Sequence, residues 1–182
     1  MSTRDARCKS TAHDAAIITL YRRVVVSPMI AHWAPLPLRL IVGYGFCAHG
    51  FAKLLRGPDN FTGLLHAMGV PMPYLMAWIT IATEIVGGMF VIVGALVPIV
   101  SVPMAIVLLV AIFTVHLQYG FSSIKLLEIT PSGAHFGQPG YETDLLYLAC
   151  IAALVIGGSG PLSVDGWLLR RSNAFTSKDR VG

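Results

Sequence analysis

The sequence predicts an all-α integral membrane protein, a bundle of four transmembrane helices with both termini in the cytoplasm. Hydrophobic residues make up 55% of the 182 residues and charged residues only 12%, against about 25% charged residues in average soluble domains. Mean hydropathy is +0.70. No charged residue lies between Glu84 and Lys125, and so long an uncharged apolar stretch is typical of membrane spans.

A transmembrane helix needs about 20 mostly apolar residues, and four segments of this chain come close to that length. They run from about Leu36 to Leu55, from Pro73 to Val97, from Pro98 to Leu117 and from Tyr141 to Ile156. Pro37 suits an opening helical turn. The fourth segment is the shortest and begins with two acidic residues.

The connections between these segments differ in character. We expect a short surface helix over residues 61–68, with Asn60 as its N-cap. Segments three and four are joined by a stretch rich in Gly, Pro and Ser, which predicts a long loop. After the fourth segment, Ser163 and Asp165 are candidate caps for a last short helix that holds Trp167 and Leu168.

Basic residues gather at the two ends of the chain and set the expected orientation. They are Arg4, Arg7, Lys9, Arg22 and Arg23 before the first segment, and Arg170, Arg171, Lys178 and Arg180 after the fourth. Loops and termini rich in Lys and Arg stay in the cytoplasm, and an even number of spans puts both ends on one side. This distribution indicates topology and not a nucleic-acid-binding surface.

The same reasoning predicts the domain organisation and the location. Residues 1–35 form a cytoplasmic or interfacial segment, residues 36–168 the transmembrane domain, and residues 169–182 a basic cytoplasmic tail. We expect a multi-pass protein of the bacterial inner membrane, in contact with lipid on all sides of the bundle.

Ionisable side chains at membrane depth are costly and usually face a bundle interior or a cavity. At a rise of about 1.5 Å per residue, Glu84 falls near the middle of the membrane. The ionisable residues His49, Lys53, His116 and Glu142 fall in its outer half. Four helices therefore supply five ionisable groups to one layer. The candidate catalytic residues are His49, Lys53, Glu84, His116 and Glu142. Arg39 lies near the inner boundary, where its side chain is expected to reach water.

Each candidate also has a purely structural interpretation. A lone buried carboxylate is protonated or paired, and Glu84 has basic partners available in Lys53 or His49. A Glu84–Lys53 pair could serve only to fix the packing of two helices. Lys53 alone could be an interfacial anchor, and Glu142 could be an ordinary acid at a helix N-terminus.

The sequence carries no familiar cofactor motif. It has no HxxH or HExxH spacing, so no metal site is predicted. It has no dinucleotide-binding glycine motif and no cysteine array for an iron–sulfur cluster, nor a haem motif. The glycines Gly43, Gly50, Gly87, Gly88 and Gly94 are expected to let helices approach closely.

Five motifs occur in a fixed order: "LRLIVGYGFCAHGFAKL", "ATEIVGG", "VHLQYGF", "GYETDLLYL" and "IGGSGPLSVDGWL". Together they resemble the DoxX family of small four-helix membrane proteins, over about Pro37 to Leu168. The family pattern falls on the five candidate residues and on Asp165.

The resemblance implies a quinone-linked or redox-associated membrane subunit. Related proteins form the membrane part of a thiosulfate:quinone oxidoreductase. On this basis a quinone is the expected cofactor, and a periplasmic or membrane redox protein is the expected partner and source of electrons. The alternative is a non-catalytic membrane scaffold or small-molecule carrier.

Overall fold

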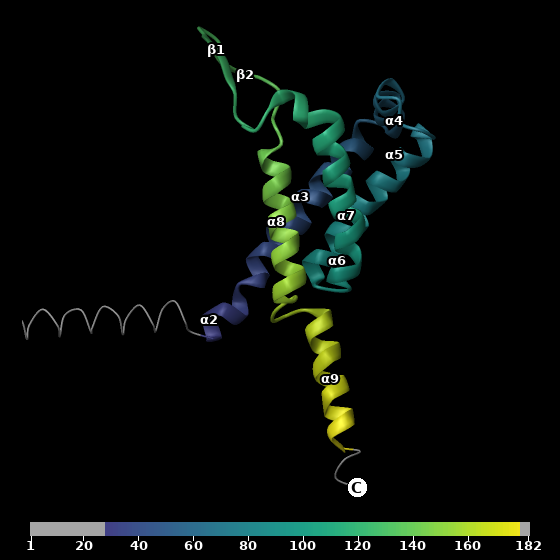
Figure 1. The fold of residues 1–182 in the computed structure, drawn as a ribbon, viewed down its shortest axis with the longest axis vertical. Helices are drawn as coiled ribbons and strands as arrows, with labels where there is room; N and C mark the ends of the chain where they lie inside the picture. Colours follow the sequence, from purple (N-terminus) through teal and green to yellow (C-terminus); the bar gives the residue numbers. More distant parts are fainter. Residues whose placement is uncertain (1–27, 179–182) are drawn as a thin grey trace, which may run out of the picture. The chain divides into compact units, whose positions relative to one another are not determined.

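A computed structural model describes residues 28–178, which are mostly helical (Figure 1). Most of the predicted interfacial segment, with the basic residues up to Arg23, lies outside the described residues, and so does Arg180. The chain divides into two units, residues 1–34 and 35–182. In the first unit the described part holds one short helix, α2 (Pro28–Trp33).

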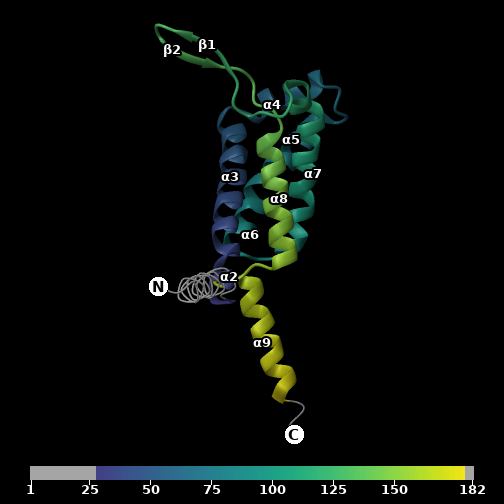
Figure 2. The same ribbon diagram turned by 60° about the vertical axis from the view of Figure 1, so that its left-hand side comes forward.

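Four long helical segments run side by side in the second unit (Figure 2). The first is α3 (Pro35–Leu55). The second joins α5 (Pro73–Ala82), the π turn η1 (Thr83–Gly87) and α6 (Gly88–Val93). The third joins α7 (Val97–Ala111), the π turn η2 (Ile112–His116) and the 3-10 turn η3 (Leu117–Tyr119). The fourth is α8 (Glu142–Gly157).

Two of these segments are long and apolar enough to cross a membrane, Pro73–Val93 and Val97–Tyr119. The other two segments are less apolar or shorter, because α3 carries the charged residues Arg39 and Lys53 and α8 has only 16 residues. The helices lie close to the predicted positions. The complete four-span bundle and its orientation remain predictions.

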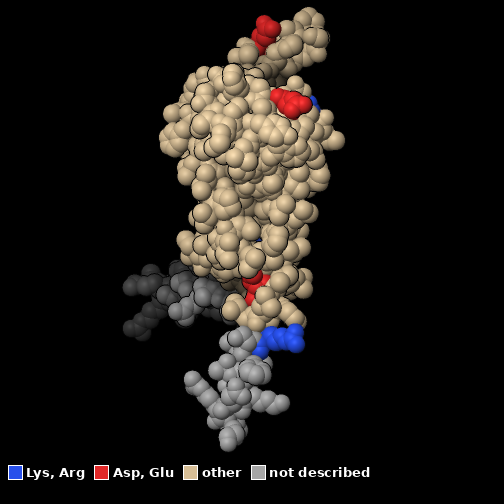
Figure 3. Space-filling view, turned by 90° about the vertical axis from the view of Figure 1, so that its right-hand side faces the viewer, with Lys and Arg blue, Asp and Glu red and all other residues tan. Residues whose placement is uncertain are grey.

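Large apolar side chains cover the outside of all four segments. Exposed examples are Leu40, Tyr44, Ile79, Val86, Ile99, Val102, Ile106, Phe113, Leu146 and Ile156. On the face drawn in Figure 3, charged side chains lie near the two ends, and other residues form most of the surface between them. An apolar surface of this extent is unfavourable in water, and it matches the surface that a lipid bilayer requires.

The structure corrects the predicted start of the helix after α3. This helix, α4 (Pro58–Ala67), begins before residue 61, with Pro58 in its first turn. Proline suits that turn because its missing N–H would have no helical partner there. Asn60 does not act as the N-cap, and its side-chain amide donates instead to the carbonyl of Arg56 at 2.5 Å.

The predicted long loop between the third and fourth segments is wrong in its middle part. It contains an antiparallel hairpin of β1 (Leu126–Thr130) and β2 (Gly133–Phe136). Thr130 pairs with Gly133 around a two-residue turn, and a φ of 129° at that position favours glycine. The second segment ends at Val93, short of the predicted Val97, because Gly94 takes a left-handed conformation. The last helix, α9 (Val164–Lys178), has 15 residues and is longer than predicted.

Glycines allow α3 to lie directly against α6, as predicted. A Cβ atom added at Gly43 would lie 2.5 Å from Cγ1 of Ile92 and 2.6 Å from the carbonyl oxygen of Gly88. One added at Gly88 would lie 2.7 Å from the sulfur of Cys47. The backbones of α3 and α6 therefore lie so close together that no side chain would fit at Gly43 or Gly88.

Arg39 is buried, with 1% of its surface exposed, so the prediction that it reaches water is wrong. Its guanidinium group binds backbone carbonyls from two distant parts of the chain. Nη1 donates to Ser159 at 2.7 Å, and Nη2 donates to Leu162 at 3.0 Å and to Ile92 at 3.2 Å. Arg39 thus joins α3 to the end of α6 and to the segment that follows α8.

Asp165 fixes the neighbouring turn between α6 and α7. Its two carboxylate oxygens accept hydrogen bonds from the backbone N–H groups of Leu96 at 2.8 Å and Val97 at 3.1 Å. These N–H groups open α7 and have no partner within the helix. The DoxX-like Asp165 therefore acts in this structure as a helix cap supplied from the far end of the chain.

Replacing Gly43 by leucine should separate α3 from α6. We expect Gly43→Leu to lower the free energy of unfolding by about 1–3 kcal/mol, seen as a lower thermal midpoint in detergent by circular dichroism. Gly63→Leu is the matched control, because nothing lies within 4 Å of a Cβ added there. Equal midpoints for the two variants would contradict the close crossing.

Arg39→Lys keeps the charge but cannot reproduce a planar group that binds several carbonyls. Each hydrogen bond to a charged group contributes about 1.5–3 kcal/mol, so we expect a loss of at least about 2 kcal/mol in stability. The same thermal measurement checks this, with Arg56→Lys, at an exposed position, as control. An unchanged midpoint in Arg39→Lys would mean that the guanidinium contacts do not stabilise the fold.

Candidate functional site

A cavity of about 310 Å³ lies among all four segments, toward the end of the bundle where α8 begins. Its polar lining residues are His49, Lys53, Glu84, His116, Thr143 and Asp144. Its apolar lining includes Phe46, Leu108, Ala111 and Tyr147. A cavity of about 150 Å³ can hold a benzene ring, so this one has room for a substituted six-membered ring.

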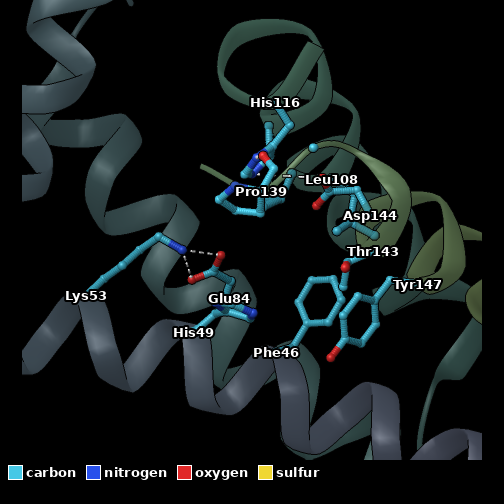
Figure 4. A pocket seen from close by; sticks show the side chains of 13 residues that line it. Phe46, His49, Lys53, Glu84, Leu108, His116, Pro139, Thr143, Asp144 and Tyr147 are labelled. Carbon is cyan, nitrogen blue, oxygen red and sulfur yellow. Dashed lines mark hydrogen bonds and ion pairs between the residues drawn. The ribbon is translucent and has the colours of Figure 1, made fainter. Parts of the chain in front are cut away.

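Lys53 and Glu84 form an ion pair on one wall of the cavity (Figure 4). The ammonium nitrogen lies 2.5 Å and 2.6 Å from the two carboxylate oxygens. Glu84 is 5% exposed, and Lys53 also lies over the ring of Phe61, 5.2 Å from its centroid. Of the two basic partners expected for a buried Glu84, Lys53 and His49, the structure pairs it with Lys53.

Two cavity residues belong to the π turns. Glu84 lies in η1, and His116 is the last residue of η2. A π turn replaces the usual helical hydrogen bond with one to a residue five positions away, and such turns occur frequently at functional sites. Both turns therefore locally change the direction in which a helix presents its side chains at the cavity.

His116 faces Asp144 on the opposite wall from the ion pair (Figure 4). Nδ1 of His116 lies 3.1 Å from the carbonyl oxygen of Pro139, and a carbonyl can only accept, so we assign the proton of the neutral ring to Nδ1. Nε2 is then free to accept, and it lies 3.9 Å from Oδ2 of Asp144.

Asp144 was not among the predicted site residues, and Glu142 was. The carboxylate of Glu142 accepts a hydrogen bond from the backbone N–H of Ser123 at 3.0 Å and is not among the residues that line the cavity. The available signal was spacing, because Asp144 lies three residues before the aromatic Tyr147 and so shares its helix face. His49, Lys53, Glu84 and His116 all line the cavity, as their expected common depth implied.

The described residues contain no group of three or more His, Cys, Asp or Glu side chains that could hold a metal ion. The cavity instead offers hydrogen-bonding groups on two facing walls. Lys53 and His49 lie on one side, and His116 and Asp144 on the other (Figure 4). Such an arrangement suits a flat ligand with polar atoms at opposite edges.

Comparison with known proteins gives two consistent results. The DoxX family model matches residues 34–117. A Bacillus subtilis (strain 168) protein named "Putative oxidoreductase CatD" is 36% identical over 135 residues, which cover 73% of this chain and 85% of that protein. A Mycobacterium tuberculosis (strain ATCC 25618 / H37Rv) protein named "Uncharacterized membrane protein Rv3486" is 28% identical over 144 residues, covering 75% and 82%. No solved structure matches the chain.

Removing one partner of the Lys53–Glu84 pair leaves an uncompensated charge in an apolar bundle. We expect Lys53→Met to cost about 3 kcal/mol in stability. The double variant Lys53→Met/Glu84→Gln should recover at least half of that loss, because it removes the stranded carboxylate. Thermal midpoints of the two single variants, the double variant and the parent chain form the test cycle. Simple additivity of the two losses would show that the pair is not coupled.

Proposed function

Because this chain belongs to the DoxX family of membrane proteins, we propose that it is a quinone-linked, redox-associated oxidoreductase subunit. In this proposal a quinone head group binds in the cavity. The observation that carries the proposal is the Lys53–Glu84 pair on the wall of a cavity otherwise lined in large part by apolar side chains. Ligand sites are typically apolar pockets with a few convergent polar groups.

The residues of the cavity fit the head group of a quinone. A quinone ring is flat, and its two carbonyl oxygens accept hydrogen bonds at opposite edges. The Lys53 ammonium has three donors, and the two oxygens of Glu84 leave one for a ligand. On the facing wall, a proton taken up on Nε2 of His116, beside Asp144, could be donated to the second carbonyl.

Each residue then has a distinct role. Lys53 and His49 would bind one edge of the ring, and Glu84 would hold Lys53 in place. Phe46 and Tyr147, whose rings meet edge to face at 5.7 Å, would contact the quinone ring through apolar packing. A bound quinone supplies the capacity to accept electrons, while the side chains supply position and protons.

We place the protein in the bacterial inner membrane with four spans, both termini in the cytoplasm and the cavity in the outer half of the bilayer. The basic ends of the sequence and the apolar outer surface of all four segments support this placement. Electrons would come from a periplasmic or membrane redox partner, because the sequence holds no flavin, haem or iron–sulfur motif.

A membrane scaffold or carrier without catalysis is the competing proposal. It is favoured by one observation, that the Lys53–Glu84 pair also joins α3 to η1 and so has a structural use. The two proposals differ in what a neutral Glu84 should change. A scaffold loses only stability, whereas a quinone site also loses ligand.

Glu84→Gln should weaken quinone binding at least 10-fold, because Lys53 loses the carboxylate that positions it. Binding can be measured by titrating purified, reconstituted protein with a tritiated benzoquinone that carries an isoprenoid chain. Glu128→Gln, at an exposed position on β1, is the matched control. Quinone binding that is equal in both variants, or absent in the parent chain, would contradict the quinone proposal. A lower thermal midpoint with no change in bound quinone would favour the scaffold.

A further inference from the structure

The cavity is closed at the end nearer the centre of the bundle. There α3 and α8 touch through Phe46 and Tyr147, with ring centroids 5.7 Å apart and planes at 87°. The hydroxyl of Tyr147 also lies close against the backbone at Gly45. No side chain larger than glycine would fit at that contact, and buried core side chains from all four segments pack in one cluster with Phe46 and Tyr147. A ligand therefore has no open path along the bundle axis from this end.

The opposite end of the cavity is closed by a set of hydrogen bonds between the chain after η3 and the start of α8. The N–H groups of Tyr141 and Glu142 donate to the carbonyls of Gly120 and Phe121 at 3.1 Å and 3.0 Å. Ser123 adds a hydroxyl contact to Thr143 at 2.8 Å.

Below these bonds, His116 is held to Pro139 at 3.1 Å. Gly140 is buried beside it and also lines the cavity. The backbone therefore covers the cavity on the side that would face water at this end of the helices. Glu142 contributes to this cover through its bond to Ser123, which gives it a place in the site without contact with the cavity.

The cavity remains open sideways, between α3 and α8. His49 on α3 and Thr143 on α8 both line the cavity and are both exposed. The residues three positions further along each helix occupy the same faces, and they are the apolar Ala52 and Leu146. Leu146 is 60% exposed. The opening is thus bordered by the same kind of apolar surface that covers the rest of the bundle.

We infer that the cavity is entered from the lipid through this opening between α3 and α8, so that its ligand is a polar ring carried on a long hydrocarbon chain that stays in the bilayer. The naming of the ring as a quinone rests on the proposed function. The route of entry follows from the two closed ends and the lateral opening.

A kinetic experiment with blocked variants tests the route. In proteoliposomes, scintillation proximity can follow the association of two tritiated benzoquinones, one with an isoprenoid chain and one without. Thr143→Phe should narrow the opening and slow association of the chain-bearing quinone about 10-fold. Thr143→Val controls for the lost hydroxyl, and Leu145→Phe, on the other side of α8, controls for an added ring. Leu145→Phe should bind at the parent rate, and the rate of Thr143→Phe is compared with that of Thr143→Val, which loses the same hydroxyl contact with Ser123.

A second measurement needs no ligand and separates the route from the proposed function. In a chain whose native tryptophans Trp33, Trp78 and Trp167 are replaced by phenylalanine, His49→Trp puts a fluorophore at the opening. Lipids with brominated acyl chains should quench its fluorescence strongly, and aqueous iodide should have little effect.

The outcomes are distinct. Efficient quenching by iodide with none by brominated lipid would overturn lateral entry, and so would equal association rates in Thr143→Phe and Leu145→Phe. Tight binding of the chainless quinone alone would also overturn it, while leaving the proposed function intact. If neither quinone binds and brominated lipid still quenches the fluorescence, the quinone proposal fails and the lateral route stands.

Discussion

The ion pair between Lys53 and Glu84 is the interaction on which the site depends. A carboxylate that is 5% exposed inside an apolar bundle needs a cation, and α3 can bring one only if it lies close to η1. Gly50 permits this, since a Cβ atom added there would lie 2.6 Å from Cγ1 of Ile85 and 3.0 Å from Cβ of Glu84. The close crossing and the ion pair therefore require each other, and together they form one wall of the cavity.

Two further sets of polar contacts hold the ends of the bundle. At one end, Arg39 and Asp165 tie the segment after α8 to α3, α6 and the start of α7. At the other end, Glu142 and its neighbours tie the start of α8 to the chain after η3. Because α8 is fixed at both ends, its start is held beside the cavity, on the far side of the Phe46–Tyr147 contact from the core. The contacts at the two ends of the bundle therefore shape the cavity as much as the residues that line it.

The helices and most of the site could be predicted from local rules. Helix spacing puts His49 and Lys53 on one face, and the cost of a buried carboxylate requires a partner for Glu84. Three features could not be predicted in this way. The acceptors of Arg39 lie at residues 159–162 and at Ile92, which no local pattern links to it. The choice between Glu142 and Asp144 depends on the rotation of α8, whose apolar residues surround it almost evenly. The short strand β1 was not predicted, because the Gly, Pro and Ser residues around it are typical of a loop.

The two π turns have a consequence for how this site can be lost. Relative to a regular α-helix, each wide turn holds one extra residue, and the turn absorbs that residue so that the helix continues beyond it. Gly88 follows directly after η1. The geometry of this turn therefore sets both the contact of Gly88 with α3 and the direction in which Glu84 points. Deleting a single residue from either turn would convert it to a regular α turn and change the direction in which Glu84 or His116 points. The site is encoded in the length of the chain as well as in its side chains.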